Sequence, residues 1–154
     1  MEIKKLLTAQ IGPKPKETKD QARLLRSFKS GALWFFWIGG LSVVNTIVLY
    51  MGSEWRMVIG LGITTILDVI GYDHPEYFIL ASIFSIAISG CFVFFGWRAI
   101  KGKRWPFVVG SVLYLLDIFI LVALEDYIGV AFHAWGVFGI STGYMSFLQL
   151  RKIK

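Results

Sequence analysis

Four long windows with almost no charge constrain this chain more than any other feature. Residues 31–53, 77–97 and 127–150 contain no Asp, Glu, Lys or Arg, and residues 105–124 contain one, Asp117. Each window holds 20 to 24 residues, and about 20 apolar residues in a helix span the ~30 Å hydrocarbon core of a bilayer. Only 17% of the chain is charged, against about a quarter in soluble domains. The sequence therefore predicts an all-α polytopic membrane protein with four transmembrane helices.

The distribution of basic residues predicts how these helices are oriented. Eight basic residues lie in residues 1–30, four in residues 98–104 and three in the tail 151–154, which makes fifteen of the sixteen in the chain. If only the four windows cross, all fifteen lie on one side, as expected when that side is the cytoplasm. We expect an integral protein of the cytoplasmic (inner) membrane with both termini in the cytoplasm. This bias also explains the net charge of +6, so we expect no nucleic-acid partner.

A fifth apolar stretch, residues 55–72, does not fit this topology as a crossing helix. Its apolar part, residues 57–70, would be about 21 Å long as a helix, against a core of ~30 Å. If it crossed, every later basic residue would change sides. We therefore expect a short re-entrant or interfacial helix that enters from the outer side. Gly60, Thr64 and Asp68 share one face of it, which should contact protein or a wet cavity rather than lipid.

Residues 1–30 are expected to form a cytoplasmic basic arm that ends in a juxtamembrane amphipathic helix. Leu24, Leu25 and Phe28 would lie on one face of this helix. The basic residues on its other faces predict contact with anionic lipid headgroups, and a partner protein is the alternative. These headgroup residues are Arg23, Arg26 and Lys29.

Glycines in the last window predict close helix packing. Gly129, Gly136 and Gly143 recur every seven residues, and Gly139 forms a GxxxG motif with Gly143 in the run GISTG. Small residues let helices approach closely in lipid. The partner helix belongs either to the same chain, which we favour, or to another copy in a homo-oligomer or larger membrane complex.

Six polar residues are expected at similar depth in the outer half of the membrane. Asn45 and Asp117 each lie eight residues from the outer end of their windows, about 12 Å deep at helical rise. Ionisable residues in a membrane raise a functional hypothesis, and the simplest pair joins Asp117 to His133 on adjacent antiparallel helices. The cluster either holds a proton or polar ligand, or forms a hydrogen-bond network that fixes the helices. Its members are Asn45, Asp68, Ser82, Ser85, Asp117 and His133.

No catalytic motif emerges from the sequence. It contains no HExxH, no CxxC and no nucleotide fingerprint, so we expect neither a metal nor a cofactor. We therefore expect a non-enzymatic membrane component, either an accessory subunit or a small scaffold, with membrane lipids as partners. The alternative is a small proton-linked transporter, channel or ligand-binding protein that uses the polar cluster.

Three short runs carry a resemblance to known proteins. GLGITTILD begins at Gly60, YLLD ends at Asp117, and EDYIGVAFHA begins at Glu125. With them the chain resembles small, uncharacterised bacterial inner-membrane proteins that have four spans. The resemblance covers most of residues 31–150 and implies a bacterial source, but it implies no activity.

Overall fold

The described part of the chain is entirely helical. The computed structural model describes residues 19–52 and 60–153, which contain helices and turns and no strand. The all-α class predicted from the sequence is confirmed. In chain order the elements are α2 (Lys19–Tyr50), α3 (Gly62–Asp73), the short 3-10 helix η1 (Pro75–Tyr77), α4 (Phe78–Ile100), α5 (Trp105–Ala123) and α6 (Tyr127–Ile153).

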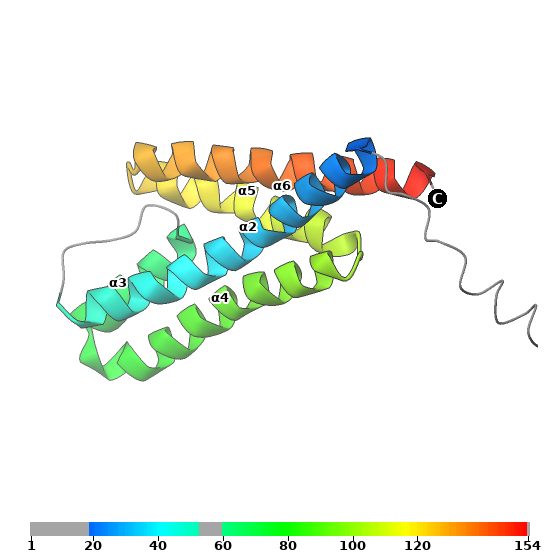
Figure 1. Cartoon of the computed structure of the whole chain (residues 1–154). Helices are drawn as coiled ribbons and strands as arrows, with labels where there is room; N and C mark the ends of the chain where they lie inside the picture. Colours follow the sequence, from blue (N-terminus) through cyan, green and yellow to red (C-terminus); the bar gives the residue numbers. More distant parts are fainter. Residues whose placement is uncertain (1–18, 53–59, 154) are drawn as a thin grey trace, which may run out of the picture.

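The four long helices run in alternating directions along one bundle, and α3 follows only part of it (Figure 1). Helix α2 packs along both α4 and α6 and is the central element. Helix α3 begins inside the bundle and runs toward the end where α2 finishes and α4 starts (Figure 1). It contacts α2, α4 and α5. With 12 residues it is about 18 Å long, and it does not pass through the bundle.

Helix α2 is longer than the sequence suggested. We expected an amphipathic helix up to residue 30 and a separate span from residue 31, but α2 is one helix of 32 residues. Helix α6 holds its first turns, because Ser146 Oγ donates to Ser27 Oγ (2.8 Å) and the Phe28 and Phe147 rings stack 5.4 Å apart. Residues 19–30 therefore continue α2 instead of forming a separate helix.

The centre of the bundle is aromatic. The ring of Phe35 is fully buried and lies 6.0 to 6.4 Å from the rings of Phe92, Phe95 and Phe107. Gly110 on α5 makes room for it, because a Cβ there would collide with the Phe35 ring. Such ring pairs contribute about 0.5–1.5 kcal/mol beyond their buried area. They join α2, α4 and α5.

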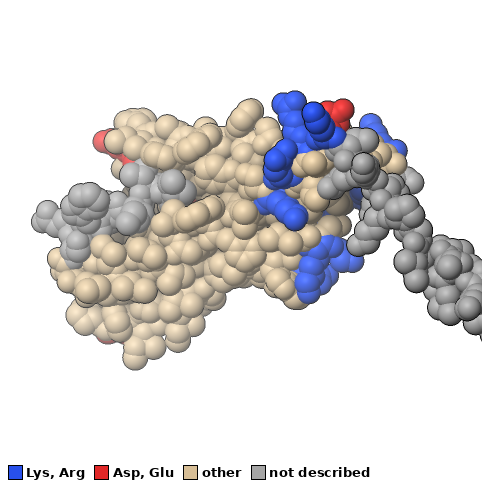
Figure 2. All heavy atoms as spheres, in the orientation of Figure 1, with Lys and Arg blue, Asp and Glu red and all other residues tan. Residues whose placement is uncertain are grey.

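The outside of the bundle is apolar along its length and charged at its ends. Large apolar side chains are exposed on several helices, such as Ile79 at 70% and Phe119 at 72%. Lys and Arg gather at the end where α2 begins and α6 finishes, with some acidic atoms beside them, and Asp and Glu without Lys or Arg are visible at the other end (Figure 2). A contiguous apolar exterior of this kind is expected of a protein whose solvent is lipid.

Three of the described helical segments are long and apolar enough to cross a membrane: α2, η1 with α4, and α5. The predicted fourth span, α6, is not among them. It has 27 residues, but its Gly, Ser, Thr, Tyr and His residues lower its hydropathy. Several of these, including Gly136, Gly143 and His133, are buried against other helices, so the polarity of α6 reflects packing inside the bundle.

Candidate functional site

The N-terminus of α3 lies inside the bundle and is capped by side chains from two other helices. Leu61 precedes the helix in an extended conformation and provides no side-chain cap. Its backbone N–H donates to Ser42 Oγ of α2 (2.9 Å). The next two N–H groups, of Gly62 and Ile63, donate to Asp117 Oδ2 and Oδ1 of α5 (2.6 and 2.9 Å). Asp117 thus does from α5 what a local Asp does at a helix N-cap, where a carboxylate also suits the positive end of the helix dipole.

This arrangement requires small residues where the chain enters α3. A Cβ on Gly62 would lie 3.0 Å from the Leu121 side chain of α5, and a Cβ on Gly60 would collide with the amide of Asn45. Asn45 is itself buried. The glycines of the GLG run therefore let the backbone approach α2 and α5 closely enough for Ser42 and Asp117 to reach its N–H groups.

Asp117 also pairs with His133, as the sequence suggested. His133 Nε2 lies 2.9 Å from Asp117 Oδ2, and Nδ1 lies 2.9 Å from the carbonyl oxygen of Gly129. A carbonyl only accepts, so Nδ1 carries a hydrogen. The contact between Nε2 and the carboxyl oxygen requires a second hydrogen, which lies between those two atoms. The ring of Tyr114 stacks on His133 with centroids 4.0 Å apart. His133 is 0% exposed and Asp117 is 4% exposed, so the pair is enclosed by protein.

Asp68 forms a second polar group two turns along α3. Its Oδ2 accepts a hydrogen bond from Thr46 Oγ1 of α2 (2.7 Å), and its Oδ1 accepts one from Ser85 Oγ of α4 (2.6 Å). Asp68 is 2% exposed. Among the described residues the ion pairs are His74–Glu76 and His133–Asp117, and Asp68 takes part in neither. Asp68 therefore ties α3 to α2 and α4 through hydroxyl groups.

The structure divides the predicted cluster into two groups joined by α3. Asp117 and His133 lie at the start of α3, near the Asn45 amide that contacts Gly60. Asp68 and Ser85 lie farther along α3. Ser82 joins neither group, because its hydroxyl donates to the carbonyl of Phe78 within α4 (2.8 Å).

Sequence reasoning missed two residues of this network, Ser42 and Thr46. Ser42 Oγ caps Leu61 and Thr46 Oγ1 binds Asp68. The two lie four residues apart in the first window and so share a face of α2. That spacing is the sequence feature from which their shared role could have been predicted.

The glycines of α6 pack against helices of the same chain. A Cβ on Gly143 would lie 2.5 Å from the Cα of Gly31, and a Cβ on Gly139 would collide with the Trp34 ring, both on α2. A Cβ on Gly136 would lie 2.8 Å from the Tyr114 ring of α5. Gly129 has a different role, since its N–H donates to Asp126 Oδ1 (2.9 Å) and helps to cap α6.

A groove of about 330 Å³ opens between α4 and α5 beside the polar network. Its lining is mainly apolar and includes Ile63, Ile88 and Leu116, with Asp117 contributing to one wall.

Comparison of the chain with models of protein families, with curated proteins and with solved structures finds no match. Its function is therefore argued from the geometry of the polar network and from the surface.

Proposed function

We propose that the protein crosses the bacterial inner membrane four times, with α2, α4, α5 and α6 as spans, α3 as a re-entrant helix and both termini in the cytoplasm. The alternating directions of the four helices support an even number of passes (Figure 1). The gathering of Lys and Arg at one end supports the orientation (Figure 2), because cytoplasmic segments carry the Lys/Arg excess. Exposed Arg23, Arg26 and Lys29 then lie at the headgroups of the inner leaflet.

Within this topology we propose a non-enzymatic role as an accessory subunit or small scaffold of a membrane complex. The observation that carries this proposal is the use of the buried polar groups. Asp117, Ser42 and Asp68 all hold α3 in place, through its first N–H groups or through its own side chain. An isolated polar group in hydrocarbon costs several kcal/mol, so a short helix that starts at membrane depth requires such partners. The network therefore acts as a structural anchor, and the exposed apolar faces are left to contact partners in lipid.

The test is the size of the assembly in its own membrane. Tagged protein at native abundance is extracted in a gentle detergent and its mass is measured by size exclusion with light scattering. The scaffold role predicts a species larger than the monomer that falls to the monomer when the same extract is treated with dodecyl sulfate. Recovery of monomer alone in the gentle detergent would contradict the proposal.

A second candidate, a small proton-linked transporter or channel, is favoured by the surroundings of Asp68. Both hydroxyls that donate to it have an alternative acceptor: Thr46 Oγ1 lies 3.2 Å from the Ser42 carbonyl, and Ser85 Oγ lies 3.5 Å from the Thr64 carbonyl. If a hydroxyl turned to its carbonyl, its oxygen would be free to accept a hydrogen from a protonated Asp68. The site can thus accommodate the carboxyl group with or without a proton.

Other titratable groups face α3 as well. The Tyr50 hydroxyl of α2 lies close to Gly71, since a Cβ there would be 2.6 Å from it, and Asp117 of α5 lies at the other end of the helix. In the described chain neither group hydrogen bonds Asp68, so the candidate rests on Asp68 itself.

Proton flux into vesicles that carry a pH-sensitive dye distinguishes the two candidates. The transport role predicts flux above that of empty vesicles, its loss in Asp68→Asn, and its retention in the control Asp73→Asn at the exposed end of α3. Wild-type vesicles that behave like empty ones would eliminate this second candidate.

A further inference from the structure

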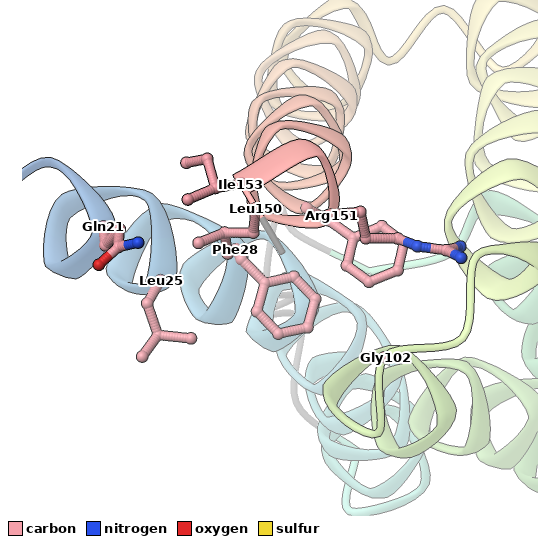
Figure 3. Close-up of a pocket in the computed structure, with 8 residues that line it drawn as sticks. Gln21, Leu25, Phe28, Gly102, Leu150, Arg151 and Ile153 are labelled. Atoms are coloured by element: carbon pink, nitrogen blue, oxygen red, sulfur yellow. The ribbon is translucent and has the colours of Figure 1, made fainter. Parts of the chain in front are cut away.

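A crevice of about 400 Å³ lies at the basic end of the bundle, away from the polar network. It is formed by the first turns of α2, the turn at Gly102 between α4 and α5, and the last turns of α6 (Figure 3). Its walls are mainly apolar, with Leu25 and Phe28 from α2 and Phe147 and Leu150 from α6. Walls of this kind suit an occupant that is itself partly apolar.

Arg151 gives the crevice its charge. It is one of the lining residues, and its guanidinium carbon lies 5.9 Å from the centroid of the Phe147 ring. Its side chain extends from α6 toward the Gly102 turn (Figure 3). Lys101 and Lys103 flank Gly102 in that turn but do not line the crevice, and Lys101 Nζ lies 3.6 Å from the centroid of the Trp97 ring. The crevice therefore combines apolar walls with a positively charged edge.

The position of the crevice along the bundle matches the level of lipid headgroups. Arg151 directly follows the uncharged window 127–150, and Leu25 and Phe28 lie six and three residues before the window 31–53. Ends of apolar windows are where a span leaves the hydrocarbon core. The surrounding surface carries Lys and Arg (Figure 2). An occupant at this level would have its apolar part toward the membrane core and an anionic part at the edge.

We propose that this crevice binds an anionic glycerophospholipid of the cytoplasmic leaflet, with the phosphate on Arg151 and the upper part of an acyl chain against Leu25, Phe28 and Phe147. The proposal rests on the membrane orientation given under the proposed function. Arginine suits a phosphate because its planar guanidinium donates two parallel hydrogen bonds. An anionic headgroup is favoured over a zwitterionic one because the nearby basic residues attract net negative charge.

The test compares binding of two lipids to the full chain. The purified protein in mild detergent is mixed with phosphatidylglycerol or phosphatidylethanolamine of identical acyl chains, and bound lipid is counted by native mass spectrometry. Wild type should retain phosphatidylglycerol in preference. Arg151→Ala should weaken that binding roughly tenfold, the loss expected for one hydrogen-bonded charge. The control Arg104→Ala removes an exposed arginine that does not line the crevice, and should change binding less than about twofold, as expected of a screened charge.

A second variant tests the apolar part of the crevice without changing charge. Leu25→Trp should fill the space between α2 and α6 and also weaken phosphatidylglycerol binding, while its circular dichroism stays that of wild type. Equal retention of the two lipids by wild type, or equal losses in Arg151→Ala and Arg104→Ala, would overturn the proposal in favour of diffuse charge attraction.

The failure of this proposal is distinguishable from failure of the proposed function. Protein that resists alkaline extraction from membranes but shows no lipid preference would overturn the lipid site alone. Protein released by alkaline extraction would overturn both.

Discussion

Asp117 performs two tasks with one carboxylate. It caps the first N–H groups of α3 and holds the imidazole of His133, so three helices meet at its two oxygens. A cap at the start of a helix is ordinarily supplied by the residue just before it, and here that residue is Leu61, which has no acceptor in its side chain. The Leu61–Gly62 entry into α3 therefore depends on a residue 55 positions farther along the chain.

Removing this carboxylate should destabilise the fold strongly. Asp117→Ala leaves two N–H groups of α3 and His133 without their acceptor, and each buried donor left unpaired costs roughly 1–3 kcal/mol. The measurement is unfolding in detergent followed by circular dichroism, with the exposed Glu125→Gln as control. Wild-type stability in Asp117→Ala would show that the pair does not anchor α3.

Two serines on α4 provide a matched comparison for the second group. Ser85 donates to Asp68, whereas Ser82 donates to a carbonyl of its own helix. Ser85→Ala should therefore lower the free energy of unfolding by about 1–3 kcal/mol, and Ser82→Ala should change it by less than about 0.5 kcal/mol. Denaturation of the two variants side by side checks this. Equal effects would show that the hydrogen bond from Ser85 to Asp68 does not stabilise the fold.

At the scale of the elements, the crossing of α2 and α6 depends on backbone contact at Gly31 and Gly143. The GxxxG motif predicted a close approach, but its partner could not be predicted, because Gly31 belongs to no recognisable motif and lies at the edge of an uncharged window. For the same reason the sequence predicts a helix boundary at residue 30, which lies inside α2. The basic residues before Gly31 indicated a surface helix, and the contacts of Ser27 with Ser146 and of Phe28 with Phe147 show why the helix continues.

A pair of glycine substitutions tests this crossing. Gly143→Ala should push α2 and α6 apart and destabilise the protein by about 1–3 kcal/mol, as overpacking generally does. Gly90→Ala on α4 meets nothing within 4 Å and should be neutral or stabilising by up to about 1 kcal/mol. Thermal unfolding of both variants in the same detergent provides the measurement. Tolerance of Gly143→Ala would contradict close contact at this point.

For the whole molecule, charge and window length predicted the helical class. They also suggested that Asp117 and His133 would pair. They could not predict the hydrogen bonds from Asp117 to Gly62 and Ile63, because these depend on where the chain re-enters the bundle and not on any periodicity. Nor could they separate Ser82 from Ser85, which lie one turn apart at similar depth. Their roles depend on the rotation of α4 against α3.

In the proposed topology α3 enters and leaves the membrane on one side, so that the chain crosses an even number of times. Reporter fusions after Asp73, after Lys101 and at Lys154 measure this directly, with alkaline phosphatase active only outside the cytoplasm and green fluorescent protein fluorescent only inside it. This topology predicts an active phosphatase after Asp73 and fluorescence at Lys101 and Lys154. Phosphatase activity at Lys101 with none after Asp73 would mean that α3 crosses the membrane, and would contradict a re-entrant α3.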